Sequence, residues 1–218
     1  MGRGQCATGP RLWLVLDALC GRNPQARACI LPAGEDAPFK AFPAPGLSAE
    51  VRRLQAGIEA LRDVEDAHLE LAADFAQMFL LDGKGGALPY ASIYDTDDTR
   101  LYGPAEARMQ GFLAGASLAV QDEFREPADH LAVYLAVMAR LTEEQAQAAD
   151  IGAAAGDQLA FLQDALLTWL PGFSAASQDA SPRFDFYPAL AALLIAVIRV
   201  DAQFIRGIAA SCMAAGAS

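Results

Sequence analysis

Hydrophobic residues recur along most of the chain at the spacing that amphipathic helices require. In the segment 63–83, one apolar face repeats with a period of about 3.6 residues and comprises Val64, Leu71, Phe75, Met78 and Phe79. Similar patterns predict helices over 11–20, 49–61, 104–116, 127–141, 153–170 and 188–210. Alanine is abundant, β-branched residues are sparse, and no two segments alternate convincingly as paired strands. The sequence therefore predicts an all-α protein.

Polar residues and prolines mark the expected helix ends. Ser48 is expected to cap the helix that follows it, while Asp63 and Asp66 have the spacing of an N-cap and a first turn. Pro104 suits the first turn of its helix, where a missing N–H leaves no hydrogen bond unmade. The pair Pro171-Gly172 is expected to stop the helix before it.

Segments rich in glycine, proline and aspartate separate the helices. Residues 21–46 carry five prolines and predict a long loop, and 83–103 form a second loop. The short polar connection 118–126 is the best candidate domain boundary. The expected organisation is thus an N-terminal helical half over 1–117, a hinge over 118–126 and a C-terminal helical half over 127–218.

Charge and composition narrow the classes of function. The net charge of −11 argues against a nucleic-acid binder and against docking on an anionic membrane surface. It suits a basic partner such as an arginine-rich peptide, although acidity also keeps an alanine-rich helical protein soluble. The four cysteines form no Cys-x-x-Cys pair and the chain has two histidines, so no metal site is expected.

Two apolar runs invite a membrane interpretation. Residues 11–20 faintly resemble a signal peptide, but Asp17 interrupts the run, which favours an amphipathic helix. The run 189–198 is about half the length that spans a bilayer, and Arg199 and Asp201 close it. A cytoplasmic protein without stable membrane insertion is expected.

The stretch Glu126-Pro-Ala-Asp-His130 precedes an apolar run. Pro127 and Asp129 suit the first turn of a helix, so capping alone explains them, and only His130 is left over. A catalytic dyad is disfavoured because neighbouring helical residues point about 100° apart, and no nucleophile motif is present. The alternative is a recognition site in which Asp129 and His130 line the mouth of a groove.

Two further groups of residues have a structural and a functional interpretation. Asp66, Glu70 and Asp74 follow i, i+4 spacing, which describes either a solvated helix face or a surface for binding arginines. Tyr90, Ser92 and Tyr94 lie in a loop. Its aromatic residues either pin the loop to the core or offer contact area for a peptide.

Several blocks of the sequence resemble the TorD branch of the TorD/DmsD chaperones. They are LELAADFAQMFL (69–80), ALPYASIY (87–94), EPADHLAVYL (126–135), WLPGF (169–173) and FYPALAALL (186–194). The similarity runs from about 54 to 203, whereas the first 46 residues depart more from the family pattern.

The resemblance implies an all-helical, cytoplasmic maturation chaperone without enzymatic activity. Its client would be a molybdenum-containing oxidoreductase, foremost trimethylamine N-oxide reductase, with dimethyl sulfoxide or nitrate reductase as alternatives. The chaperone would bind the twin-arginine signal peptide and the apo form of the client, and so aid molybdopterin insertion before export. A nucleotide-hydrolysing helical protein is the remaining alternative.

The resemblance also assigns candidate binding residues. The family's Asp-His pair falls on Asp129 and His130, within the hinge segment that includes Glu126 and Pro127, and the aromatic loop falls on Tyr90, Ser92 and Tyr94. No resident cofactor is implied beyond weak binding of guanine nucleotide, and the expected state is a monomer or a domain-swapped homodimer.

Overall fold

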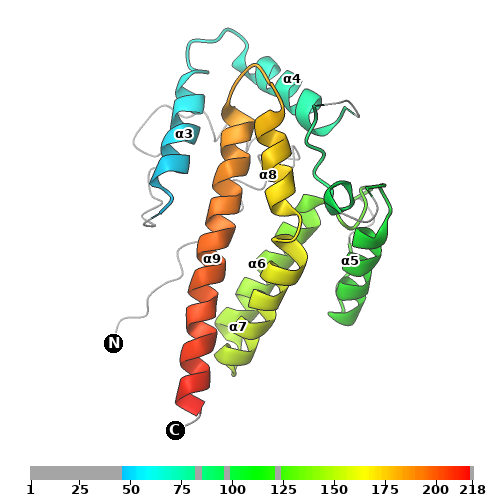
Figure 1. The fold of residues 1–218 in the computed structure, drawn as a ribbon, viewed down its shortest axis with the longest axis vertical. Helices are drawn as coiled ribbons and strands as arrows, with labels where there is room; N and C mark the ends of the chain where they lie inside the picture. The colour runs from blue at the N-terminus through cyan, green and yellow to red at the C-terminus, as the bar shows by residue number, and fades with distance from the viewer. Residues whose placement is uncertain (1–45, 82–84, 96–98, 121–123, 217–218) are drawn as a thin grey trace.

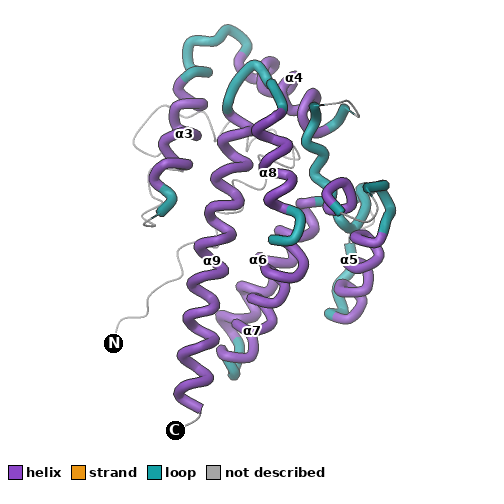
Figure 2. Tube along the Cα trace, viewed as in Figure 1, coloured by secondary structure: helices purple, strands orange, loops and turns teal. Residues whose placement is uncertain are grey.

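Helices make up most of the described part of the chain, which confirms the all-α prediction (Figures 1 and 2). The computed structural model describes residues 46–81, 85–95, 99–120 and 124–216, so the predicted helix 11–20 and nearly all of the loop 21–46 lie outside it. Its elements are α3 (Ser48–Glu59), α4 (Ala67–Phe79), the 3₁₀ turn η1 (Ala91–Tyr94), α5 (Pro104–Gly115), α6 (Leu131–Gln147), α7 (Ile151–Ala160), the π-helical segment η2 (Phe161–Leu166), α8 (Leu170–Asp179) and α9 (Phe186–Gly216).

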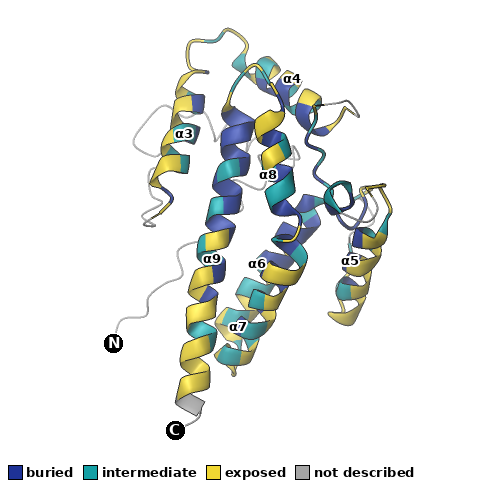
Figure 3. Cartoon of the chain, viewed as in Figure 1, coloured by how far each residue is buried: buried dark blue, intermediate teal, exposed yellow. Residues whose placement is uncertain are grey.

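The long helix α9 forms the axis of the bundle, and α3, α7 and α8 pack along it (Figure 1). Leu190, Leu194 and Ile198 on α9 are fully buried, whereas the helix becomes exposed toward its C-terminal end (Figure 3). By length and composition, α9 is the one described helix that could cross a membrane. Most of that apolar stretch is buried against the other helices, as in the core helix of a bundle.

Aromatic residues join α4 to the C-terminal helices. Phe79 lies 5.5 Å from Tyr187 and 6.1 Å from Phe173, and Phe75 lies 5.7 Å from Tyr187, measured between ring centroids. Full burial of an aromatic side chain such as Phe173 stabilises a fold by roughly 2–3 kcal/mol. The N-terminal helices α3 and α4 thus contact the C-terminal helices directly. The division into two halves around 118–126 stays a prediction, and residues 121–123 lie outside the described ranges.

The N-terminal ends of α3 and α4 differ from the prediction. Ser48 is the first residue of α3 and not its cap, because Leu47 occupies the cap position without a side-chain hydrogen bond. Helix α4 begins at Ala67, after Asp66 in a left-handed conformation with φ of 58°. A carboxylate near the helix start complements the positive end of the helix dipole without capping an N–H.

The start of α6 is the main correction to the helix boundaries. The helix begins at Leu131 instead of Pro127, because the backbone before it pairs with another segment. Asp129 O accepts a hydrogen bond from Ala91 N at 3.0 Å, and Leu131 N donates to Pro89 O at 2.8 Å. Pro127–His130 form a separate turn, closed by a hydrogen bond from His130 N to Pro127 O at 3.1 Å, and His130 itself is extended, so the helix starts only at Leu131.

The helix predicted over 153–170 is also divided differently. Backbone hydrogen bonding changes from α-helical to π-helical at Phe161, and a new helix, α8, begins at Leu170. Pro171 lies in the first turn of α8, where its missing N–H has no intrahelical partner, so it does not stop a helix. A Cβ on Gly172 would lie 3.1 Å from Cδ1 of Tyr94, so a larger residue there requires the Tyr94 ring to shift by a few tenths of an ångström.

Candidate functional site

Two of the predicted groups of site residues meet in one place. The segments around Tyr90 and His130 run antiparallel and form an isolated β-bridge between these two residues. The bridge brings the loop 87–94 against the segment that precedes α6. Among the sequence-predicted candidates it therefore gathers Glu126, Pro127, Asp129, His130, Tyr90, Ser92 and Tyr94.

Asp129 and Ser92 form a fully buried pair at the centre of this contact. Asp129 Oδ2 accepts hydrogen bonds from the Ser92 backbone N at 2.8 Å and from Ser92 Oγ at 2.6 Å, and both residues are 0% exposed. Asp129 therefore lies neither in the first turn of α6 nor at the mouth of a groove, which corrects both interpretations of its sequence position. Its carboxylate holds the 3₁₀ turn η1 in place.

His130 performs the capping role that the sequence assigned to its neighbours. Its Nδ1 accepts a hydrogen bond from Ala132 N at 3.0 Å, so His130 is the N-cap of α6. The imidazole ring lies edge-on between two aromatic rings, with centroids 5.0 Å from Tyr90 and 5.6 Å from Phe124. The cap therefore also fixes one side of an aromatic cluster at the protein surface.

Glu126 and Tyr90 carry the polar atoms at the edge of this cluster. The Tyr90 hydroxyl donates a hydrogen bond to Glu126 Oε2 at 2.7 Å. Burial, followed by the hydrogen bond to Glu126, raises the pKa of Tyr90, so the phenol stays protonated and remains a donor. Pro127 is buried, whereas Glu126 is exposed and offers its carboxylate to solvent.

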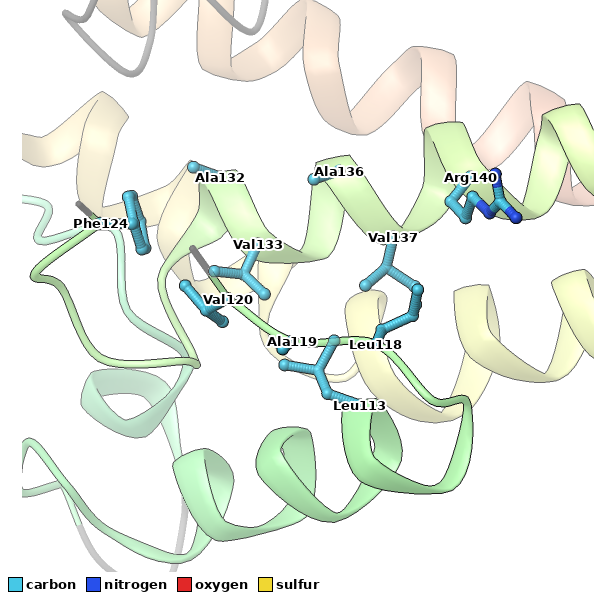
Figure 4. A pocket seen from close by; sticks show the side chains of 10 residues that line it. All are labelled: Leu113, Leu118, Ala119, Val120, Phe124, Ala132, Val133, Ala136, Val137 and Arg140. Carbon is cyan, nitrogen blue, oxygen red and sulfur yellow. The ribbon is translucent and has the colours of Figure 1, made fainter. Parts of the chain in front are cut away.

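An apolar groove begins beside His130 and follows α6. It has a volume of about 520 Å³ and is lined by Leu113 of α5, by Val120 and Phe124 of the connection, and by Val133 and Val137 of α6 (Figure 4). This volume falls in the range of roughly 300–1,000 Å³ that is common for ligand sites. Sequence reasoning missed the groove because its lining residues look like core, although apolar Val120 and Phe124 in a polar connection were a signal.

Arg140 is the charged residue in the lining of the groove, and acidic residues border a hollow beside it (Figure 4). An adjoining hollow of about 460 Å³ shares Leu113, Val120 and Phe124 with the groove and is bordered by Glu106 and Glu126. An apolar surface with carboxylates at its rim can bind a segment that carries both hydrophobic and basic side chains.

The predicted acidic stripe on α4 lies in a different environment. Asp74 is buried and accepts hydrogen bonds from the backbone N of Arg183 at 2.8 Å and of Phe184 at 2.9 Å. Glu70 pairs with the Arg183 guanidinium at 2.5 Å, while Asp66 is exposed. The three residues therefore do not form one solvated face, and Asp74 instead anchors the turn that leads into α9.

Tyr94 is part of the core contact of the loop. Its hydroxyl donates to Leu88 O at 3.0 Å, and its ring stacks on Trp169 with a centroid distance of 6.0 Å and an interplanar angle of 17°. Burial raises the pKa of the Tyr94 phenol. The interpretation of this loop as pinned to the core by its aromatic residues is thus correct for Tyr94.

The sequence of the chain is similar to those of known chaperones. A family model described as the nitrate reductase delta subunit matches residues 44–175. Chaperone protein TorD of Psychrobacter sp. (strain PRwf-1) is 41% identical over 175 residues, which cover 78% of each chain. The chain belongs to the TorD chaperone family. The TorD chaperone of Photobacterium profundum is 42% identical over 166 residues, with 75% of this chain and 76% of the relative covered.

Family membership confirms the resemblance inferred from the sequence blocks. The matched range 44–175 contains the bridge between Tyr90 and His130, the Asp129–Ser92 pair and the whole apolar groove of this TorD-family chain. The TorD relative of Vibrio cholerae (serotype O1, strain O395) is 39% identical over 71% of each chain and is likewise named a chaperone.

Proposed function

We propose that this chain is a cytoplasmic chaperone that binds the twin-arginine signal peptide and the apo form of a molybdoenzyme, with trimethylamine N-oxide reductase as the client. Its binding would support insertion of the molybdopterin cofactor before export. Membership in the TorD chaperone family supports the maturation role. The apolar groove and the acidic residues that border the hollow beside it support peptide binding.

The groove has the chemistry that a signal peptide requires. Such peptides combine a basic N-terminal region with an apolar stretch of roughly 7–15 residues. The apolar stretch would be buried against Val120, Val133 and Val137, and burial yields about 25 cal/mol per Å² of apolar surface. Glu106 and Glu126 at the adjoining hollow would face the basic region, since arginine binds carboxylates with paired hydrogen bonds.

The charge of the whole chain favours the same partner. A net charge of −11 attracts a basic peptide during encounter and speeds association at low ionic strength. Salt would therefore weaken binding, mainly by slowing association.

Calorimetric titration of the full chain with a synthetic twin-arginine signal peptide tests this function. We expect binding at low salt that weakens as salt increases. Two control peptides separate the contributions, one with citrulline in place of both arginines and one with serines in place of the apolar stretch. Both should bind more weakly than the parent peptide. Absence of binding by the parent peptide at low salt would refute the signal-peptide role.

A second enzyme is a candidate client of the chaperone. The matching family model carries the name of a nitrate reductase subunit, which favours a nitrate reductase as the second candidate client. Isolating the tagged chain from its native cell and identifying the apo-enzyme that copurifies distinguishes the two. Recovery of nitrate reductase alone would exclude trimethylamine N-oxide reductase as the client.

A further inference from the structure

A separate pocket of about 280 Å³ is also bordered by α5, through Arg108, Met109 and Phe112. Its walls come from η1, α5, α6 and the π-helical segment η2 with the turn that follows it. Five aromatic residues line it, namely Tyr94, Phe112, Tyr134, Phe161 and Trp169. A volume just below the usual range for drug-sized ligands, roughly 300–1,000 Å³, leaves room for one side chain.

The aromatic rings that line the pocket pack on one another, and Tyr94 and Phe112 are the half-buried ones. Trp169 stacks nearly parallel to Tyr94, and its ring centroid lies 5.3 Å from that of Tyr134. The ring centroids of Phe112 and Phe161 lie 4.8 Å apart. The negative faces of such rings attract a cation within about 6 Å, and a planar guanidinium can also stack on them.

The charged residues of the pocket also favour a cation. Asp95 and Asp164 contribute two carboxylates, against one guanidinium from Arg108. Arg108 Nη2 pairs with Asp95 Oδ2 at 2.7 Å, but the Arg108 side chain is 67% exposed and that of Asp95 only 11%. Arg108 thus reaches a nearly buried carboxylate from outside. Within the described residues, Asp164 has no ion pair.

One wall of the pocket has a π-helical backbone. Phe161 and Asp164 lie in the π-helical segment η2, where the chain departs from α-helical hydrogen bonding. Such segments are rare and frequently occur at functional sites. Here the segment supplies the Phe161 ring and the exposed carboxylate of Asp164 to the pocket.

We propose that this pocket receives an arginine side chain of the client's signal peptide, and that Arg108 is a resident competitor for Asp95. The proposal rests on the proposed function, because it assigns a place to one of the peptide's two arginines. The guanidinium would stack on the aromatic wall and pair with Asp164, and on displacing Arg108 it would pair with Asp95. Lysine would be a poorer ligand, since an ammonium neither stacks nor binds a carboxylate in a bidentate manner.

Removal of the Asp164 carboxylate is the first test. Affinities of a labelled twin-arginine peptide and of its citrulline counterpart are measured by fluorescence anisotropy. Asp164→Asn should lower the affinity for the arginine peptide about threefold, as for a partly exposed ion pair, and leave the affinity for the citrulline peptide unchanged. Asp157→Asn is the matched control, because it removes one carboxylate from the adjoining helix α7 and should change neither affinity.

Removal of the Arg108 guanidinium is the second test, and it should strengthen peptide binding instead of weakening it. Arg108→Gln should strengthen binding of the arginine peptide by about threefold, because the guanidinium that pairs with Asp95 Oδ2 is removed. Arg62→Gln removes the same charge near the end of α3, where the Arg62 side chain is 51% exposed, and controls for the change in net charge.

The outcomes separate this proposal from the proposed function. If the arginine peptide binds but Asp164→Asn and Arg108→Gln behave like their controls, the pocket does not hold an arginine, and peptide binding stands. If the arginine peptide does not bind the unmodified chain at low salt, the proposed function fails and the pocket assignment fails with it. Selective effects of the two pocket variants on the arginine peptide would support the assignment.

Discussion

The buried Asp129–Ser92 pair predicts that mutation of Asp129 lowers the stability of the fold, although the sequence motif suggests a recognition site. Asp129→Ala removes the acceptor of two hydrogen bonds and leaves a buried backbone N–H and a buried hydroxyl without partners. A hydrogen bond to a charged group contributes about 1.5–3 kcal/mol, and a buried carboxylate carries an opposing desolvation cost. We therefore expect a loss of about 3 kcal/mol in the free energy of unfolding. For a chain of this size, that corresponds to a decrease in Tm of roughly 6–12 °C.

Urea denaturation and thermal melting of three variants test this reasoning. Asp129→Asn keeps an acceptor oxygen and should be milder than Asp129→Ala. Glu126→Ala removes the exposed acceptor of the Tyr90 hydroxyl, so it should cost about 1 kcal/mol, less than Asp129→Ala, while weakening peptide binding. A Tm for Asp129→Ala within 1–2 °C of the unmodified chain, on the scale of roughly 2–4 °C per kcal/mol, together with a large loss of peptide affinity, would refute the structural role.

Further predictions concern packing, the groove and pH. Gly172→Ala places a Cβ against the ring of Tyr94 and should cost about 1–3 kcal/mol in urea denaturation, with a change in near-UV circular dichroism. Phe124→Ala removes a ring that lines the groove and contacts His130. It should lower the affinity for the signal peptide about tenfold in titration calorimetry. Burial raises the pKa of Asp201 to about 6, above its unfolded value, so its contribution to stability is present at low pH and is lost as pH rises from about 4 to about 6. The difference in unfolding free energy between the unmodified chain and Asp201→Asn should therefore vary with pH in that window, and a constant difference would contradict it.

The sequence predicts the helices well and their tertiary roles poorly. Apolar residues at helical spacing locate α4, α5 and α9 because that spacing is a local property of a buried helix face. Helix α6 starts later than predicted, because hydrogen bonds from Ala91 and to Pro89 fix the preceding turn outside the helix. Local capping rules contain no information about a partner nearly forty residues away along the chain (|i−j| = 37 for Ser92 and Asp129).

The same limitation explains the site. The family blocks located the residues that meet at the bridge. Asp129, however, binds Ser92 instead of lying in the first turn of α6, and His130, to which local rules gave no role, caps the helix. Asp74 looked like part of a solvated stripe because its hydrogen-bond donors, the amides of Arg183 and Phe184, come from a distant turn. The groove could not be predicted, since it depends on how α5 and the connection lie against α6.

The attachment of α5 has a consequence for the dynamics of the chaperone. The backbone of this helix comes close to the rest of the bundle chiefly at η1, its other contacts are side-chain contacts such as that between Phe112 and Phe161, and Figure 1 shows it at the side of the bundle away from α9. Residues of α5 nevertheless form walls of both the groove and the aromatic pocket. Helices with few tertiary contacts open at free energies below that of global unfolding. Amides of α5 should therefore exchange with deuterium sooner than those in the buried part of α9, and a bound client peptide should slow that exchange by holding α5 against the bundle.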